Sequence, residues 1–356
     1  MELVSKNKVT FVIGHLLQGG SERVVSNLSW EMSEMGMDVA ILSYYAAEPV
    51  YELHPSVKLI EVQTETGSKN VLSNILFVRH IFKQRQGVIY SFIAVFNMIS
   101  IVAHIGLKSK LIVADRNDPN CVPGKALIRA IRNFLYRFAD CIVVQTSANA
   151  DYFRKRKCRQ VKVIYNPLDL FGKNGQSLKS EKKDVVVSVG RLVEQKNQEM
   201  MIKAFERVHR VLPSYKLIIY GDGDKRGELI EFIRKYALSD CIELPGNRKD
   251  IFDEISSAKL FALSSNFEGM PNSLVEAMGL GLPVISTKVS GATDLIKDRI
   301  NGELVDIDDD RTLAERMIAI LKDDELQIRY GEEAVKIADE LSKNNITKEW
   351  ILVSEI

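Results

Sequence analysis

The chain has 356 residues, of which 46% are hydrophobic and 27% are charged, and its formal net charge is +1. This length and composition are typical of a two-domain globular enzyme and exclude a disordered chain. The charge is unevenly distributed, because residues 1–175 hold 22 Lys and Arg against 14 Asp and Glu, whereas the remainder holds 26 against 33.

The positive excess lies between Lys125 and Lys162, where Arg129, Arg132 and Arg137 are expected on one helix beside aromatic residues. Such a cluster predicts either a solvated helix face or a surface for anionic lipid or a lipid-linked diphosphate. We expect no nucleic-acid partner, because the chain shows no motif of a DNA- or RNA-binding module.

Four cysteines show no C-x-x-C pairing, and the first hydrophobic run, 8–13, follows the N-terminus without a signal peptide. We therefore expect a cytoplasmic protein with free thiols. The run 88–107 contains no Lys, Arg, Asp or Glu. Its polar and small residues nevertheless favour a strand followed by a helix over a membrane span.

Short hydrophobic runs alternate with helical patterns along the whole chain. This alternation predicts parallel sheets covered by helices on both faces. The expected strands of a first domain, 1–168, lie near 9–13, 39–42, 88–92, 111–114, 141–144 and 161–164. A polar stretch, 169–183, is typical of a linker. The expected strands of a second domain, 184–342, lie near 185–189, 216–220, 242–244, 260–263 and 283–286.

Two adjacent glycines, Gly19 and Gly20, lie in the loop after the first expected strand. Glycines let the backbone approach a ligand closely, although a plain connecting turn explains them as well. The loop lacks the G-x-G-x-x-G spacing of a dinucleotide site. Of the five histidines, only His15 lies in a candidate site loop, and the others show no metal-ligand spacing.

Two cations, Arg191 and Lys196, lie in the loop that begins with Gly190 after the strand 185–189. If both converge on one diphosphate, they would neutralise the charge that builds on a leaving group in the transition state. A surface pair beside Glu194 is the alternative.

The stretch Gly221-Asp222-Gly223-Asp224 follows the strand 216–220 and fits either a tight turn or a D-x-D metal site. The same D-x-D pattern recurs at Asp306-Ile307-Asp308 in an acidic loop. The pattern is therefore a weak sign of a metal, and we expect none.

Two glutamates, Glu268 and Glu276, lie eight positions apart where the strand 260–263 leads into a helix. Helix N-termini attract phosphate, so amides from Pro271 onward would face a diphosphate. An ionised carboxylate only accepts hydrogen bonds. Glu268 would therefore accept from sugar hydroxyls, and Glu276, expected in the first turn of the helix, would accept from ribose hydroxyls. Alternatively, Ser273 and Glu276 form a capping box.

The stretches E-G-M-P-N-S-L-V-E-A from Glu268 and G-R-L-V-E-Q-K from Gly190 resemble the signature motifs of family 4 retaining glycosyltransferases of the GT-B type. The resemblance implies two Rossmann-like domains facing across a cleft, with a C-terminal helix, about 343–356, returning to the first domain. It also implies a metal-independent enzyme without a cofactor, in which Arg191, Lys196 and Glu268 are catalytic. The residues implied in donor binding are Gly19, Gly20, Gly190, Gly221, Asn247, Arg248, Gly269, Met270, Pro271, Asn272, Ser273, Leu274 and Glu276.

On the acceptor side, the resemblance implies contacts from His15 and from the end of the fourth expected strand. Many members carry a histidine at that strand end, whereas this chain has Arg116. Arg116 would donate to a sugar hydroxyl or phosphate, with Asp115 or Asp118 orienting it. A turn held by Pro119 is the alternative.

The resemblance as a whole implies transfer of a hexose or N-acetylhexosamine, with retention, from a UDP-sugar. The acceptor would be a saccharide or a polyprenyl-diphosphate-linked saccharide in the synthesis of lipopolysaccharide, capsule or another bacterial surface polysaccharide. The enzyme would lie in the cytoplasm or, as a peripheral protein, on the inner face of the cytoplasmic membrane. The alternatives are a GT-B sugar-nucleotide epimerase, an NAD-dependent oxidoreductase and a catalytically silent binding protein.

Overall fold

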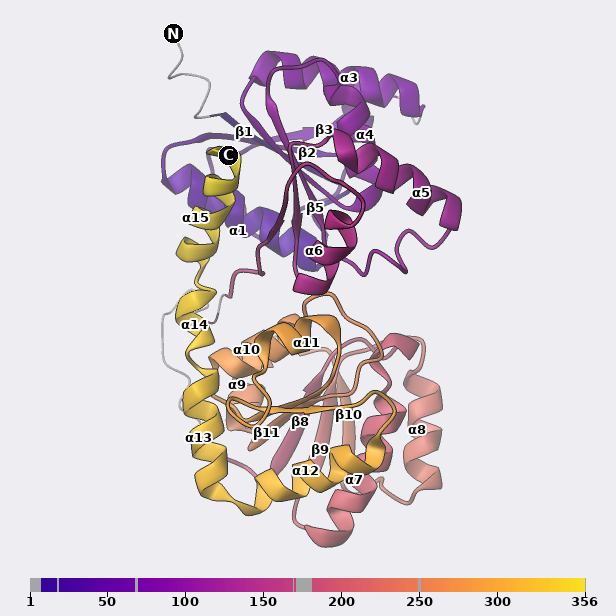
Figure 1. Cartoon of the computed structure of the whole chain (residues 1–356). Coiled ribbons are helices and arrows are strands. Elements are labelled where there is room, and N and C mark those ends of the chain that lie inside the picture. The colour runs from indigo at the N-terminus through magenta and orange to yellow at the C-terminus, as the bar shows by residue number, and fades with distance from the viewer. Residues whose placement is uncertain are drawn as a thin grey trace. The chain divides into compact units, whose positions relative to one another are not determined.

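The computed structural model describes residues 8–17, 19–67, 70–168, 170, 181–248 and 251–355. The chain divides into two compact units: unit 1 comprises Met1–Pro167 and Lys343–Ile356, and unit 2 comprises Leu168–Ser342 (Figure 1). Each unit is a parallel sheet with helices between its strands, so the predicted α/β class with two Rossmann-like domains is confirmed. The linker expected at 169–183 lies largely outside the described residues.

Unit 1 contains seven parallel strands in the order β3-β2-β1-β4-β5-β6-β7. They are β1 (Lys8–Ile13), β2 (Asp38–Ser43), β3 (Lys58–Glu61), β4 (Val88–Phe92), β5 (Lys110–Asp115), β6 (Cys141–Val144) and β7 (Val161–Val163). Apolar runs predict six of these strands but miss β3, because β3 lies at the sheet edge and its residues are largely exposed. The strand order reverses between β1 and β4, and parallel α/β sheets bind ligands at the carboxyl ends beside such a reversal.

Helices α3, α4 and α5 form a neighbouring series in unit 1, because α4 packs against both others, whereas α1 packs against α15. The helices of unit 1 are α1 (Gly20–Glu34), α2 (Val62–Thr66), α3 (Val71–Arg85), α4 (Ala94–His104), α5 (Ala126–Leu135), the 3₁₀ turn η1 (Tyr136–Phe138), α6 (Ser147–Arg154) and α15 (Lys343–Glu355). The apolar run 88–107 forms β4 and α4, as predicted. Within the described residues, no helix is long and apolar enough to cross a membrane.

The last helix, α15, completes the core of unit 1. Trp350 is fully buried and stacks on Phe92, with their ring centroids 5.4 Å apart. The hydroxyl of Tyr90 donates to the carbonyl of Trp350 at 2.8 Å. Ile346 and Val353, which the sequence places on the same face as Trp350, are buried as well.

Unit 2 contains six parallel strands in the order β10-β9-β8-β11-β12-β13. They are β8 (Val185–Val189), β9 (Lys216–Tyr220), β10 (Ile242–Gly246), β11 (Leu260–Leu263), β12 (Val284–Thr287) and β13 (Glu303–Val305). The helices are η2 (Glu194–Lys196), α7 (Gln198–Val211), α8 (Arg226–Lys235), α9 (Ile251–Ser257), α10 (Asn272–Gly279), α11 (Ser290–Leu295), α12 (Asp310–Lys322), α13 (Asp324–Ala334) and α14 (Ile337–Glu340). Strand β13 was not predicted from the sequence, because it is only three residues long.

The central strands of unit 2 are short and apolar, β8 as V-V-V-S-V and β11 as L-F-A-L, and their burial fits a sheet that is covered on both faces. The strand order reverses between β8 and β11. The loops that follow these two strands carry the motifs that begin at Gly190 and Glu268. The topology of unit 2 therefore brings the two motifs together at the edge where such sheets bind ligands.

Candidate active site

Backbone hydrogen bonds join the loops at the carboxyl ends of the strands of unit 2. The amide of Asn266, after β11, donates to the carbonyl of Gln195, after β8, at 2.8 Å. Gly190 donates to Tyr220, and Gly221 donates to Gly246, both at 3.0 Å. Four loops that are distant in sequence thus form one connected surface in this unit.

The loops after β8 and β11 share a partly buried ion pair between Lys196 and Glu268. Nζ of Lys196 lies 2.5 Å from Oε1 of Glu268, and their side chains are 14% and 8% exposed. The Ser265 hydroxyl donates to the same oxygen at 2.8 Å, and the Gln195 amide donates to Oε2 at 3.3 Å. Three donors therefore fix the orientation of the Glu268 carboxylate.

The motifs predict Lys196 and Glu268 as site residues, but they predict neither the pairing of the two side chains nor the supporting hydrogen bonds from Gln195 and Ser265. Gln195 lies inside the motif that begins at Gly190, and Ser265 lies three residues before the motif that begins at Glu268. Closeness to the two motifs was the available signal.

Arg191 presents an exposed cation in the loop that carries Lys196. Its side chain is exposed and makes no hydrogen bond or ion pair with any residue in the described part of the chain. Its carbonyl accepts a hydrogen bond from the Gln198 side chain at 2.8 Å, which anchors the backbone of the loop. A Cβ at Gly190 would lie 3.2 Å from Cε of Lys196, so glycine leaves room for the lysine stem.

The Gly221-Asp222-Gly223 stretch forms a tight turn. Gly221 has φ +132°, and a Cβ there would stand 2.0 Å from the carbonyl oxygen of Gly190. The Asp222 carboxylate accepts from the amide of Gly223 at 2.8 Å. Among the residues that the structure describes, no three His, Cys, Asp or Glu side chains are grouped as metal ligands. Independence from metal stays a prediction.

Helix α10 begins at Asn272 after Pro271, and no side chain caps its N-terminus. The hydroxyl of Ser273 donates instead to the carbonyl of Val189 at 2.9 Å, so Ser273 is not the N-cap of the capping box considered above. The amides of the first turn of a helix carry partial positive charge, and in α10 that of Leu274 donates to the carbonyl of Pro271 at 3.1 Å.

Glu276 was expected in the first turn of its helix. It is the fifth residue of α10 and therefore lies in the second turn. Its side chain is buried. Met270 and Leu274 are buried too, so they offer a ligand mainly their backbone. Gly269 lies against α11, because a Cβ at Gly291 would stand 2.2 Å from its carbonyl oxygen.

Asn247 and Arg248, predicted near the nucleobase, follow directly after β10 and are exposed. The turn that carries them begins at Gly246, which has φ +83°. The two residues that follow Arg248 lie outside the described part of the chain. The assignment to the nucleobase therefore stays a prediction.

In unit 1, the loop after β1 folds against a buried glutamate that the sequence analysis did not name as a site residue. Glu22, in the first turn of α1, is 6% exposed, and its Oε1 lies 3.5 Å from Nδ1 of His15. A Cβ at Gly19 would stand 2.2 Å from Oε2 of Glu22. Gly19 thus makes room for this carboxylate, and Gly20 begins α1.

Arg116, at the carboxyl end of β5, is a buried cation with an open donor. It is 9% exposed, and its guanidinium lies over the Phe92 ring, 5.8 Å from the centroid. With the Gln145 amide oriented to satisfy both of its ends, the amide oxygen accepts from Nη2 of Arg116 at 2.8 Å. Nη1 is buried without a partner among the described residues.

Burial lowers the pKa of Arg116 to about 9, and the charge of nearby Glu22 opposes that shift. The guanidinium therefore remains charged at neutral pH. A buried charged donor without a partner is rare in folded proteins and commonly marks a place for a ligand or ion. The arrangement suits an anion or a hydroxyl group.

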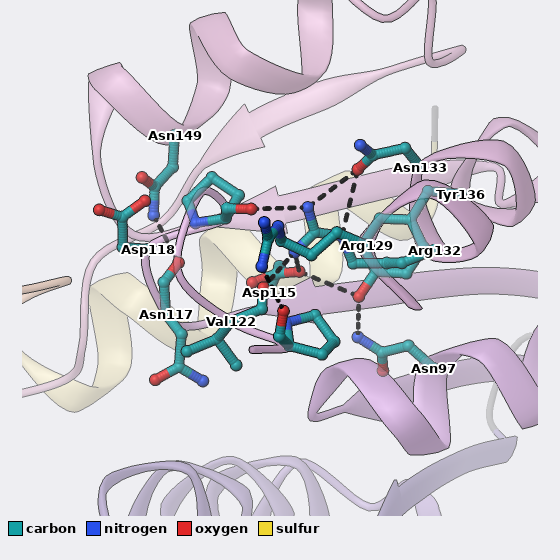
Figure 2. Close-up of polar contacts among 12 residues, drawn as sticks. Asn97, Asp115, Asn117, Asp118, Val122, Arg129, Arg132, Asn133, Tyr136 and Asn149 are labelled. Atoms are coloured by element: carbon teal, nitrogen blue, oxygen red, sulfur yellow. Dashed lines mark hydrogen bonds and ion pairs between the residues drawn. The ribbon is translucent and has the colours of Figure 1, made fainter. Parts of the chain in front are cut away.

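The structure does not support the expectation that Asp115 or Asp118 orients Arg116. Oδ2 of Asp115 accepts from the Tyr136 hydroxyl at 3.0 Å and lies 3.8 Å from the fully buried guanidinium of Arg132 (Figure 2). Burial raises the pKa of Asp115, although the charge of Arg132 opposes the shift. Asp118 instead accepts from the amide of Asn120 at 2.8 Å.

Arg129 and Arg132, predicted on a surface helix, donate hydrogen bonds to backbone carbonyls of the loop after β5. Arg132 donates to the carbonyls of Val122 and Pro119 at 2.5 and 2.8 Å. Arg129 donates to the carbonyls of Pro123 and Gly124 at 3.0 and 2.7 Å. Figure 2 shows Arg132 beside Asp115, Tyr136 and Arg129. No local motif signalled this role.

A cavity of about 530 Å³ in unit 1 lies at the opposite edge of the sheet, where Val9, Val88 and Lys110 begin their strands beside Ile351 of α15. Parallel α/β sheets bind ligands at the carboxyl ends of their strands. We therefore place no substrate in this cavity.

Two family models match the chain in succession. The model described as Glycosyltransferase Family 4 matches residues 18–170, and the model described as Glycosyl transferases group 1 matches residues 173–337. The chain is 28% identical to a Campylobacter jejuni alpha-1,4-N-acetyl-D-galactosaminyltransferase, with 98% of this chain and 99% of that protein covered. It is 26% identical to the amylovoran biosynthesis glycosyltransferase AmsD of Erwinia amylovora, with 93% and 95% covered.

Among solved structures, HepE of Anabaena in complex with UDP matches with a TM-score of 0.84 and 20% identity, over 98% of this chain and 100% of that chain. A complex of S. aureus TarM with UDP matches with a TM-score of 0.82 and 13% identity, over 98% and 100%. At such low sequence identities, the similarity to these structures supports the fold alone. The family models and the architecture agree, and the chain belongs to family 4 of the glycosyltransferases with the GT-B fold.

Proposed function

We propose that this glycosyltransferase moves a hexose or N-acetylhexosamine from a UDP-sugar, with retention and without a metal, to a saccharide acceptor in bacterial surface polysaccharide synthesis. The observation that carries the proposal is the partly buried pair of Lys196 and Glu268 at the strand-order reversal of unit 2, with the exposed cation of Arg191 in the same loop as Lys196.

In the proposed reaction, the bond from the sugar's anomeric carbon to the diphosphate breaks, and a bond to the acceptor oxygen forms on the same face. Arg191 and Lys196 would stabilise the negative charge that develops on the diphosphate, together with the first amides of α10. A diphosphate oxygen would take the acceptor's proton. This step uses binding and charge stabilisation by the protein and requires no covalent intermediate.

Glu268 is proposed to accept hydrogen bonds from hydroxyls of the transferred sugar. Lys196, Ser265 and Gln195 already donate to its carboxylate, which holds the group in place and lowers its reactivity as a nucleophile. These contacts support the route without a covalent intermediate. Glu276 is proposed to accept from the ribose hydroxyls of the donor.

On the acceptor side, Arg116 is proposed to donate through Nη1 to a hydroxyl or phosphate oxygen, with His15 nearby in the loop after β1. The Campylobacter relative is named for a GalNAc-containing substrate linked through PP to undecaprenol. A polyprenyl-diphosphate-linked saccharide is therefore the acceptor class to test first. Such an acceptor would place the enzyme at the inner face of the cytoplasmic membrane.

The first test is thermal stabilisation by UDP, GDP, ADP and NAD in the presence of a chelator. A ligand at 100 times its dissociation constant adds about 2.7 kcal/mol to the stability of the state that binds it. We expect selective stabilisation by UDP. Stabilisation by NAD alone would favour the oxidoreductase, and a UDP shift that appears only with added manganese would contradict a metal-free site.

Product analysis then separates the remaining alternatives. A UDP-sugar donor incubated alone should stay intact or hydrolyse slowly, whereas an epimerised sugar would identify an epimerase. With acceptor present, the NMR coupling constant of the new anomeric proton should report the same configuration as in the donor. The opposite configuration would overturn the retaining mechanism.

A further inference from the structure

Helix α5 buries its charge and exposes its apolar residues. Arg132 and, one turn later, Tyr136 are fully buried. The outward side, called the α5 face below, consists of Leu127 (73% exposed), Ile131 (47%) and Phe134 (57%) of α5 and Phe138 (50%) of the adjoining turn η1. A surface helix in water ordinarily places its apolar stripe toward the core and its charges outward. The α5 face is thus an apolar patch without a partner within the described residues.

The inward anchoring of α5 prevents this patch from turning toward the core. Arg132 is bonded to two carbonyls of the preceding loop and paired with Asp115, so rotating the helix would expose these groups or leave them unpaired (Figure 2). Such buried charges are costly to separate. The exposure of the α5 face therefore follows from the same contacts that hold the loop.

The surroundings of the α5 face are positively charged. The sequence contains no acidic residue between Asp118 and Asp140. Lys125 precedes α5 and Arg137 follows it, and both side chains are exposed.

The patch extends toward the end of α4. Phe138 lines a hollow of about 420 Å³ together with Ile105, Lys108 and Arg159. Ile105 is 59% exposed, and Asp140, which lines the same hollow, pairs with Arg159 at 3.5 Å. The hollow therefore adds an apolar side chain and the cation of Lys108 next to the α5 face.

We propose that the α5 face docks on an anionic lipid bilayer. Its apolar side chains would enter the boundary between headgroups and acyl chains, while Lys125 and Arg137 contact lipid phosphates. An apolar stripe flanked by cations is the chemistry of helices that lie in a membrane interface. A second copy of this chain fits less well, because a two-fold contact would bring the same cations together.

Co-sedimentation of the full chain with vesicles tests the proposal without donor or acceptor, so its outcome does not depend on the proposed reaction. Vesicles of phosphatidylglycerol and phosphatidylcholine are compared with phosphatidylcholine alone. The test variant is Leu127→Ser with Phe134→Ser, and the matched control is Ile328→Ser, which removes a 61% exposed apolar side chain from α13 of unit 2. Because all three side chains are exposed, both variants should keep the wild-type unfolding temperature.

We expect wild type and the Ile328 variant to sediment with anionic vesicles, and the Leu127/Phe134 variant to bind at least about tenfold more weakly. Equal binding of wild type to neutral and anionic vesicles, or undiminished binding of the Leu127/Phe134 variant, would overturn the proposal. Light scattering completes the test: a wild-type dimer that this variant converts to a monomer, without vesicle binding, would assign the face to a second copy.

Discussion

The two units hold their candidate site residues in different ways. In unit 2, Lys196 and Glu268 lie in loops whose own residues, such as Gln195 and Ser265, supply the supporting hydrogen bonds. In unit 1, arginines of α5 donate hydrogen bonds to the backbone carbonyls of the loop after Arg116. The comparison teaches that a short motif can specify the first kind of site, whereas the second depends on partners distant in sequence.

The largest expected effect tests the buried support in unit 1. Arg132→Leu should lower the free energy of unfolding by about 3–5 kcal/mol, because it leaves the Asp115 carboxylate buried without its cation. Urea denaturation at neutral pH measures the change.

The matched control is Arg159→Ala, which breaks an exposed pair with Asp140 and should change stability by about 1 kcal/mol or less. Combining Arg132→Leu with Asp115→Asn should recover part of the lost stability, because the double variant no longer buries an unpaired carboxylate. If the Arg132 and Arg159 variants cost the same, the buried network does not support unit 1 as described.

The next effect concerns the ion pair of unit 2. Lys196→Ala should reduce kcat/KM about 10²–10³-fold, if the cation stabilises the leaving group like a preorganised donor. Lys216→Ala is the control, because Lys216 also pairs with a glutamate, Glu243, but lies at the amino end of β9. Initial rates with a donor chosen by the ligand screen give the comparison. Turnover of the Lys196 variant at the wild-type rate would remove Lys196 from the proposed mechanism.

A smaller effect tests the close loop contacts of unit 2. Gly221→Ala should cost about 1–3 kcal/mol or more, because of its positive φ and the close approach of the Gly190 carbonyl. Gly227→Ala, in the first turn of α8 with no atom within 4 Å of the added carbon, should instead stabilise by up to about 1 kcal/mol. Thermal unfolding of both variants checks the opposite signs. A shift in the same direction would show that the Gly221 turn can relax.

The smallest effect is a pH dependence in unit 1. Burial lowers the pKa of His104, while its bond to the Ser109 carbonyl and the charge of Asp140 oppose the shift and Arg79 adds to it. A depressed histidine pKa means that the unfolded chain binds more protons, so the stability that neutral His104 contributes is present above about pH 6.5 and is lost as pH falls below it.

Urea denaturation at pH 7.5 and 5.5 should therefore show a smaller loss for His104→Gln than for wild type. The control is His80→Gln, a change at an exposed side chain of α3, which should keep the wild-type difference. Identical differences in wild type and the His104 variant would exclude this group as the source.

The sequence predicts the class of fold and most strands, because buried parallel strands appear as continuous apolar runs. It misses β3 and β13 for physical reasons: the first is an exposed edge strand and the second is very short. It also names Lys196 and Glu268 separately. Their contact spans 72 positions of sequence and arises only because β8 and β11 are neighbours in the sheet.

The sequence prediction fails most clearly at α5. Its cations and apolar residues both recur at helical spacing, so periodicity alone does not decide which side is buried. Arg132 faces inward because Asp115 and the loop carbonyls supply partners there. Those partners come from another strand and loop, and no pattern within the helix reveals them.

The position of Trp350 in the core of unit 1 has a consequence for biosynthesis. The seven strands of unit 1 end at Val163, but the side chain that fills their core arrives after all of unit 2. At about 5–20 residues per second, translation leaves roughly 10–40 s between Val163 and Trp350. Unit 2, whose ends Leu168 and Ser342 form a β-bridge, can complete its core during that interval. Synthesis therefore supplies all of unit 2 before the residue that completes the core of unit 1.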